Sequence, residues 1–282
     1  MIDWEPRQTI EAAYRRAIQS LMNKFMELIP LDIEDPYDIG DLLQTYASSD
    51  IFQEFAHATA RKMVTGLFVD GSRTWREAAQ ESGMGKMLRA ALARELEGPV
   101  GIRMQQLIDE NAELISSFPL NIAKEVNEFV REESLAGRRA ATIASSFREQ
   151  FPEVTAGRIA LISRTETGKT STALIRARAE EIDLNWYEWE TSQDQRVRRS
   201  HRKMQSVLVN WNDPPSPEML IGEKPHGHYH AGNIYNCRCY PAPVVRFDLL
   251  QWPAKVYYGG HVQYMTFANF RRVAGAIFAE AA

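Results

Sequence analysis

The sequence predicts an α+β protein, in which a mainly α-helical N-terminal region precedes a small α/β C-terminal domain with short strands. Apolar residues recur at three- and four-residue spacing through the first 158 residues, which is the period of amphipathic helices. β-branched and aromatic residues gather in short runs beyond residue 184, as is typical of strands. Both cysteines and four of the six histidines fall within residues 186–243. We therefore expect a helical region over 1–153, an α/β domain over 154–245, and an accessory hairpin and helix over 246–282.

The N-terminal region is expected to hold seven or eight modest helices. Pro6 suits a first helical turn, and an apolar stripe follows it as far as Pro30, where the helix should end. The stripe consists of Ile10, Tyr14, Ile18, Leu21, Phe25 and Leu28. Gly83-Met84-Gly85 should close a later helix, and Gly98-Pro99 should kink or restart the next one. No grouping of carboxylates and histidines in this region suits catalysis, so its charges are interpreted as a solvated face.

The second half of the chain mixes helix and strand signals. Residues 154–181 predict one long helix with Thr155 as its cap, and short β-prone runs follow at 185–190, 207–211 and 235–245. A helix from Asp194 to Met204 is expected between the first two strands. Gly259-Gly260 predicts a hairpin turn, and a closing helix is expected over 267–279.

Composition limits the class of protein. The 282 residues are 44% hydrophobic and 25% charged, with a net charge of −4, which is ordinary for a soluble protein and argues against a dedicated nucleic-acid coat. No apolar run of about 18 residues could span a bilayer, and the N-terminus lacks a signal-peptide pattern. The two cysteines, only one residue apart, argue against a disulfide-stapled secreted protein. We expect synthesis in a reducing cytoplasm and no membrane partner.

The tetrapeptide Gly168-Lys169-Thr170-Ser171 invites a phosphate-loop interpretation, which the surrounding sequence rejects. That motif needs a glycine five residues before Gly168, and Ser163 occupies the position. No strand-like run leads into it either.

The Cys237-Arg238-Cys239 segment is the strongest chemical signal. Residues i and i+2 of an extended segment point to the same face, so both sulfurs can converge on one external atom. Zinc prefers thiolate and imidazole ligands in a tetrahedron. We predict a structural Zn²⁺ site with Cys237, Cys239 and His201 as ligands, and His228 or, alternatively, His230 as the fourth. Two inert buried thiols, or a redox pair, are the alternatives.

A basic run accompanies this segment. Arg198, Arg199, Arg202 and Lys203 are candidates for sequence-independent contact with DNA phosphates. A structural role is favoured for a polar network of six residues, in which Arg196 and Arg238 are buried in pairs with Asp194 and Glu166. Its members are Arg164, Glu166, Asp194, Arg196, Asn236 and Arg238, and the pair Arg164 and Glu166 would hold the β elements electrostatically.

The order of these motifs resembles the phage Mu F-like minor head protein family. The series begins with Trp189, Asp194, Arg196, Arg198 and His201, continues with the tract WNDPP, and closes with GNIYNCRCYP. Upstream, the tract ISRTE resembles the family's "ARTE" helix, so the likeness covers residues 159–245. NCRC is its most specific part. Met204-Gln205-Ser206 departs from the family's usual L-D-G turn.

The resemblance implies a role in head morphogenesis of tailed phages or prophages, near the portal, with a part in DNA packaging or delivery. It implies location in the virion and partnership with the portal protein and other head proteins. Because the helical region 1–153 precedes the matched motifs and holds no catalytic grouping, we infer that it docks on the partner. It also supports His201 as a ligand, because that position holds His or Cys in the family. The alternative is an enzyme, a metal-assisted nuclease or toxin-like hydrolase using Asp194 and His201.

Overall fold

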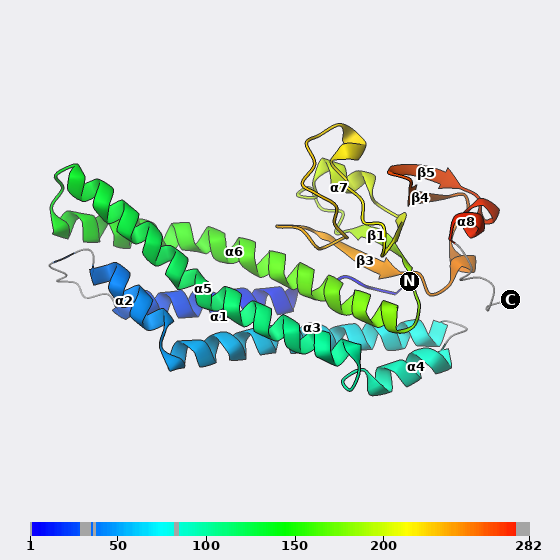
Figure 1. Cartoon of the computed structure of the whole chain (residues 1–282), viewed down its shortest axis with the longest axis horizontal. Coiled ribbons are helices and arrows are strands. Elements are labelled where there is room, and N and C mark those ends of the chain that lie inside the picture. The colour runs from blue at the N-terminus through cyan, green and yellow to red at the C-terminus, as the bar shows by residue number, and fades with distance from the viewer. Residues whose placement is uncertain (1, 29–34, 36–37, 82–84, 275–282) are drawn as a thin grey trace. The chain divides into compact units, whose positions relative to one another are not determined.

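A computed structural model describes residues 2–28, 35, 38–81 and 85–274, and it confirms the α+β class (Figure 1). The chain divides into two compact units. The helical unit comprises Arg7–Leu67 and Met104–Thr167, and the sheet unit comprises Met1–Pro6, Phe68–Arg103 and Gly168–Ala282. Three helices contribute residues to both units: α3 (Asp50–Glu81), α5 (Pro99–Leu135) and α6 (Ala140–Glu181).

The helical unit buries the stripe predicted for the first helix. This helix is α1 (Gln8–Leu28), and α2 (Asp38–Ala47) follows it. Tyr14, Ile18, Leu21 and Phe25 of the stripe are buried, and the Tyr14 hydroxyl donates a hydrogen bond to Asn111 Oδ1 of α5 at 3.3 Å. The predicted stop at Pro30 and the break at Gly83-Met84 lie outside the described residues.

Arg164 and Glu166 belong to the helical unit, where both interact with residues of α1. The Arg164 guanidinium lies 3.0 Å from the Glu11 carboxylate, and the pKa of Tyr14 is raised, first by burial and then by the Glu166 charge. The predicted role of Arg164 in holding the β elements is therefore wrong, because its charge is matched by an acid on α1.

The helix predicted over 154–181 is the C-terminal part of a longer one. α6 runs without a break through Pro152, so the predicted boundary between 153 and 154 falls inside it, and the three-domain division stays a prediction. Thr155 does not cap a helix. Its hydroxyl bonds back to the Phe151 carbonyl at 2.8 Å, an arrangement compatible with a continuing helix.

The sheet unit is built on a five-stranded sheet in the order β3-β1-β2-β4-β5. All neighbours are antiparallel except β2 and β4. The strands are β1 (Trp186–Thr191), β2 (Val207–Asn210), β3 (Cys239–Pro243), β4 (Ala254–Tyr258) and β5 (His261–Met265). The tight link between β4 and β5 is the predicted hairpin at Gly259-Gly260. Short helices connect or follow the strands: α7 (Arg199–Lys203), η1 (Met219–Ile221), η2 (Phe247–Leu249) and α8 (Phe267–Val273).

Alternation along the strands gives the sheet two buried faces. Tyr187, Trp189 and Val207 share one core with Ile175 and Ala179 of α6. The same core takes residues from α3 and from α4 (Gly85–Arg94), including Trp75 and Leu88. The opposite face packs Trp186, Leu208 and Val256 against Phe270 of α8. The closing helix was expected to reach Ala279, but residues 275–282 lie outside the described part.

A buried ion pair joins three segments within the sheet unit. Arg178 of α6 donates to the Glu95 carboxylate at 2.6 Å and to the Phe68 carbonyl and the Ser72 hydroxyl of α3. Because both charges are buried, removing one partner of such a pair costs about 3–5 kcal/mol.

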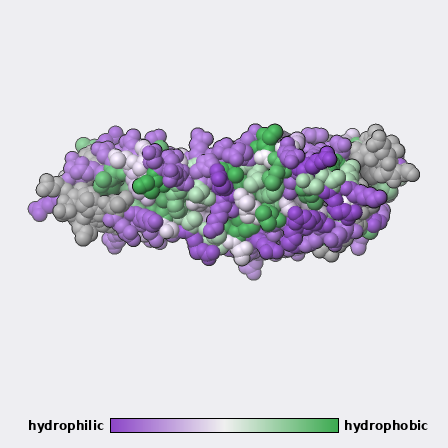
Figure 2. Space-filling model, turned by 90° about the horizontal axis from the view of Figure 1, so that it is seen from below, coloured by the Kyte–Doolittle hydropathy of each residue, from purple (hydrophilic) through white to green (hydrophobic). Residues whose placement is uncertain are grey.

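The surface carries scattered hydrophobic residues. Figure 2 shows them on one face as patches interrupted by hydrophilic side chains, and the exposed large ones include Val69, Leu96 and Ile102 of the sheet unit. Within the described residues, no helix combines the length and apolar character that a membrane span requires.

Candidate metal centre

The topology of the sheet brings the two cysteines to His201. β1 ends at Thr191 and leads into the connection that carries α7, while antiparallel β3 begins at Cys239, directly opposite Thr191. The end of one strand and the start of its neighbour therefore meet at the same edge. Asn236, with a φ of 50°, turns the chain immediately before Cys237.

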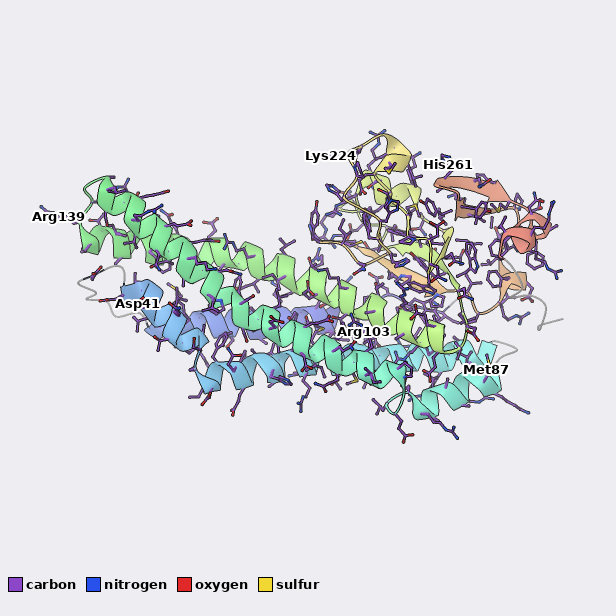
Figure 3. The ribbon with its side chains drawn as sticks, viewed as in Figure 1. Asp41, Met87, Arg103, Arg139, Lys224 and His261 are labelled. Atoms are coloured by element: carbon purple, nitrogen blue, oxygen red, sulfur yellow. The ribbon has the colours of Figure 1, made fainter. Side chains whose placement is uncertain are left out.

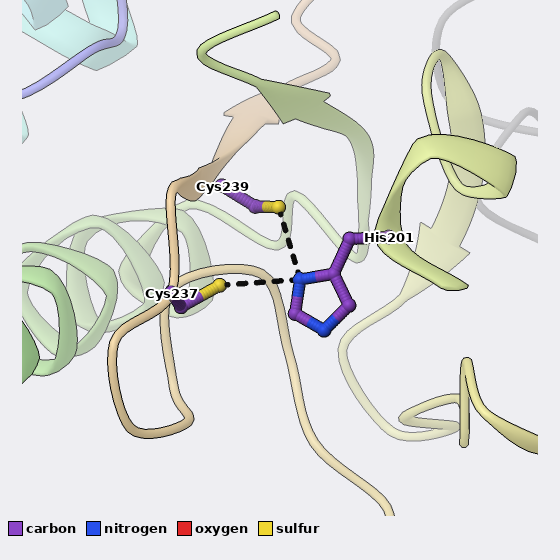
Figure 4. Close-up of side chains that lie close together, drawn as sticks. All are labelled: His201, Cys237 and Cys239. Carbon is purple, nitrogen blue, oxygen red and sulfur yellow. Dashed lines mark hydrogen bonds between the residues drawn. The ribbon is translucent and has the colours of Figure 1, made fainter. Parts of the chain in front are cut away.

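His201, Cys237 and Cys239 form a compact buried cluster (Figure 4). His201 Nδ1 lies 3.3 Å from the Cys239 sulfur and 3.5 Å from the Cys237 sulfur. The exposed fractions of the three residues are 1%, 7% and 6%, respectively. The three side chains point toward one another, as predicted, and could hold a metal ion.

The spacing of these atoms fits a tetrahedral zinc ion. With bonds of about 2.3 Å to sulfur and about 2.1 Å to nitrogen, a tetrahedral angle separates nitrogen from sulfur by roughly 3.6 Å. The two observed nitrogen–sulfur distances are close to that value. Thiolates and imidazole are ligands that zinc prefers, whereas magnesium and calcium prefer oxygen ligands.

The structure does not bring either of the predicted fourth ligands to the cluster. His228 is exposed, and its Nδ1 lies 3.0 Å from the Pro214 carbonyl oxygen. His230 is buried elsewhere, with Nδ1 3.1 Å from the Tyr187 hydroxyl and its ring against Trp211. Among the described residues, the cluster of histidine, cysteine and acidic ligands consists of His201, Cys237 and Cys239.

Two buried residues that the sequence did not single out lie on the far side of the His201 ring. His201 Nε2 is 3.0 Å from the Tyr229 hydroxyl, which donates to Glu218 Oε1 at 2.6 Å. Ser200 also donates to this oxygen, at 3.2 Å. Glu218 lies in the proline-rich tract PPSPEML, where a single acid gives no recognisable signal.

Burial and hydrogen bonding shift the pKa values of the two cysteines and of Glu218 in different directions. The hydrogen bond from Cys239, supported by His201, holds the pKa of the Cys237 thiol well below its usual range, whereas burial raises the pKa of Cys239. Burial also opposes ionisation of Glu218, but hydrogen bonds from Tyr229 and Ser200 outweigh it and lower its pKa. A thiolate and a carboxylate are thus favoured inside the site.

The helix predicted from Asp194 to Met204 is shorter than expected, because Asp194 organises a turn. Its carboxylate accepts a hydrogen bond from the Arg196 backbone N–H at 2.8 Å, and Gln193 before it has a φ of 53°. Such local side-chain bonds compete with helix formation. α7 therefore begins only at Arg199 and presents His201 from its middle.

Asp194 is the centre of the polar network in the sheet unit. It pairs with Arg238 at 3.0 Å and with Arg196 at 3.3 Å. Arg238 is largely shielded from solvent, but the Arg196 side chain is 70% exposed. The predicted burial of Arg196 is wrong, because its guanidinium lies on the solvent side of Asp194.

Three of the four predicted DNA-contact residues are exposed, and the fourth, Arg198, stacks on an aromatic ring. Arg199, Arg202 and Lys203 are exposed. Arg198 stacks its guanidinium 4.3 Å from the ring centre of Tyr235, which also contacts the His226 ring. Lys224 lies at the outer edge of the same loop (Figure 3).

The tetrapeptide at 168–171 has a packing role. A side chain on Gly168 would meet the Gly232 carbonyl oxygen at 3.1 Å, and Thr172 donates a hydrogen bond to the Ala231 carbonyl at 2.7 Å. These glycines let α6 approach the loop that leads to the cysteines.

Comparison with known proteins gives a family match over the region that contains the cluster. Residues 124–241 match the family model described as Phage Mu protein F like protein. The resemblance stated from the motifs is confirmed for this segment, which begins within α5 and ends within β3.

One curated relative is an uncharacterized protein of Haemophilus influenzae, 27% identical over 143 residues. The alignment covers 51% of this chain and 30% of that protein, so the chain spans less than a third of the relative it matches. No solved structure matches the chain.

Proposed function

We propose, taking the Mu protein F-like segment over residues 124–241 as the premise, that this chain is a structural minor head protein of a tailed phage or prophage. It would act in head morphogenesis and reside in the virion after synthesis in the bacterial cytoplasm. The family match carries the proposal, because the matched segment includes His201 and both cysteines.

The burial of the cluster favours this structural role over hydrolysis, although three protein ligands alone would leave one position of a tetrahedral zinc ion open. A catalytic zinc keeps a position open to water and substrate, but His201, Cys237 and Cys239 are buried. The hydrolase alternative needs Asp194 beside His201. Asp194 instead pairs with Arg238 and Arg196, and the His201 ring faces Tyr229.

The proposed cofactor is one structural Zn²⁺ held by His201 Nδ1 and the two thiolates. When bound, it would neutralise the thiolates and cross-link the α7 connection to the start of β3. Because the ligands converge only in the folded chain, metal binding energy becomes folding energy.

A metal assay tests the cofactor directly. The purified full-length chain should contain one equivalent of zinc, and Cys237→Ser should lower both the zinc content and the melting temperature. His228→Ala is the matched control, since it removes an exposed histidine outside the cluster. Unchanged zinc content in Cys237→Ser would show that the cluster is not the metal site.

The proposed partners are the portal protein and other head proteins, with the helical region 1–153 as the docking part. Exposed apolar side chains of that region, among them Ile51, Leu120 and Leu135, would be available to a partner. Non-specific DNA contact through Arg198, Arg199, Arg202 and Lys203 is also proposed, supported by the exposure of Arg199, Arg202 and Lys203 and by the stacking of Arg198 on the exposed Tyr235 ring. Replacing Arg199, Arg202 and Lys203 by Ala should then weaken DNA binding and flatten its salt dependence.

Co-sedimentation tests the virion role. Heads purified from cells that express the tagged chain with its phage or prophage should contain it, and a tagged host protein of similar size should stay behind. Recovery of the folded chain only in the soluble fraction, with heads free of it, would contradict the proposal.

A further inference from the structure

A buried carboxylate that is not itself a metal ligand, that of Glu218, lies beside His201, with Oε1 3.8 Å from His201 Nε2. Glu218 is 2% exposed and lies on the opposite side of the imidazole from the thiols. Its Oε1 accepts hydrogen bonds from Tyr229 and Ser200, whereas its Oε2 has no hydrogen-bond partner among the described residues. Burying a carboxylate is costly unless a positive charge lies nearby.

Counting protons along this chain of contacts places a proton on Nε2 of His201. The Tyr229 hydroxyl has one proton, and the 2.6 Å contact with the Glu218 carboxylate uses it. At the 3.0 Å contact with His201, the hydroxyl oxygen can then only accept, so Nε2 must carry the ring proton. With the proton on Nε2, a neutral ring presents the lone pair of Nδ1 toward the two sulfurs, as a metal ligand requires.

We propose that Glu218 and Tyr229 are positioning residues of the metal centre. They form a relay from carboxylate to phenol to imidazole that selects the Nε2–H form of His201 and orients Nδ1 toward the ion. The inference rests on the proposed zinc site. The His201 ring itself lies 3.8 Å from Glu218 Oε1, and a divalent ion on the other side of the ring would add positive charge that attracts the buried carboxylate. Histidine ligands commonly depend on such outer partners for affinity.

The relay also explains how the loop between β2 and β3 is tied to the centre. The sequence predicts that a histidine from this loop binds the metal, but the loop instead supplies both members of the relay. Their backbone is fixed locally: the Tyr229 N–H donates to the Pro215 carbonyl at 3.0 Å, and the Glu223 N–H donates to the Glu218 carbonyl at 3.0 Å. The loop thus contacts the centre through hydrogen bonds to the ligand His201.

Zinc affinity of the full-length chain, measured by competition with a chromophoric chelator, tests the relay. Tyr229→Phe and Glu218→Gln should each bind one zinc about 10–100-fold more weakly than the parent protein. Tyr187→Phe is the matched control, because it removes another buried tyrosine hydroxyl bonded to a histidine, but to His230. It should bind zinc as the parent does.

The possible failures are distinguishable. If the parent binds zinc through Cys237 and Cys239 while both relay variants keep its affinity within about twofold, the relay is wrong and the metal site stands. If the parent binds no zinc, the proposed cofactor itself fails. Should either variant lose its fold, the ring nitrogen chemical shifts of His201 in the metal-free parent, at a pH where the ring is neutral, decide: a proton on Nε2 supports the relay, and a proton on Nδ1 overturns it.

Discussion

His230 is a buried histidine whose surroundings favour its neutral form. It contacts the Tyr187 hydroxyl, while Arg176 of α6 approaches its other nitrogen at 3.5 Å. Burial first, and the Arg176 charge second, lower the pKa of His230 from 6.5 to about 4. Below pH 6.5 the unfolded chain therefore binds a proton that the folded chain does not, so folding loses stability as the pH falls from 6.5 to about 4. A shift of this size corresponds to about 3 kcal/mol.

Replacing His230 by Gln removes this titration. Urea unfolding of both proteins at pH 7.5, 6 and 4.5 should show the stability of the parent falling more steeply than that of His230→Gln. Carboxylates and the metal ligands titrate in both proteins, so the difference between them isolates His230. A difference that stays constant over the pH range would contradict the assignment.

Among individual residues, the sequence predicted the metal ligands, whose side-chain chemistry is distinctive. It missed the residues whose role depends on where the folded chain places them. Two cysteines at i and i+2 and a nearby histidine have few other uses, and they converge as expected. His228 or His230 was expected as the fourth ligand, but neither reaches the cluster, and Gly227, with a φ of 110°, turns the chain just before them. Glu218 and Tyr229 lie beside His201 only because the loop between β2 and β3 folds back onto the cluster, and the sequence does not reveal this path.

The elements around the centre depend on the close approach of α6 to the loop before β3. Gly232 has a φ of 83°, and a side chain there would lie 2.3 Å from the Thr172 hydroxyl and 3.1 Å from the Cys239 carbonyl oxygen. Gly227 also has a positive φ, but a side chain on it would meet nothing within 4 Å. A substitution at Gly227 would therefore test backbone strain alone, whereas one at Gly232 would test backbone strain together with steric crowding.

Alanine at each position should destabilise the sheet unit unequally. Gly227→Ala should cost about 1–2 kcal/mol from the unfavourable backbone conformation, and Gly232→Ala about 1–3 kcal/mol more from crowding. Chemical denaturation of the zinc-bound proteins measures both. If both variants lost the same free energy of unfolding, the loop would be able to move away from α6 without a loss of stability.

Strands and helical regions were predictable because their signals are repeated over many residues. Helix lengths were not: modest helices were expected in the N-terminal region, and α3, α5 and α6 are instead long and continuous. The ends of helices and strands were less predictable, because a single side chain can decide where an element begins or ends. Asp194 delays α7 by bonding the backbone of Arg196, and Pro152 fails to end α6. Neither outcome follows from local propensity, because the same residues could also have capped or broken a helix.

At the scale of the whole molecule, the ligands come from the sheet unit alone, so metal loss should act unevenly along the chain. His201 lies on α7 and the cysteines lie at the start of β3, while the helical unit contributes no ligand to the described cluster. Zinc at 100 times its dissociation constant would stabilise the folded form by about 2.7 kcal/mol. That stabilisation should be lost when a chelator removes the ion.

Hydrogen exchange followed by mass spectrometry can locate this loss. Chelation should increase exchange in α7, in β3 and in the loop between β2 and β3, because these segments are cross-linked by the ion or by the hydrogen bonds of its ligand. α1 and α2 should exchange as before. His201→Ala should show the chelated pattern even with zinc present, whereas His228→Ala should follow the parent. Uniformly faster exchange in both units would mean that the ion supports the fold as a whole, and unchanged exchange would mean that it supports neither.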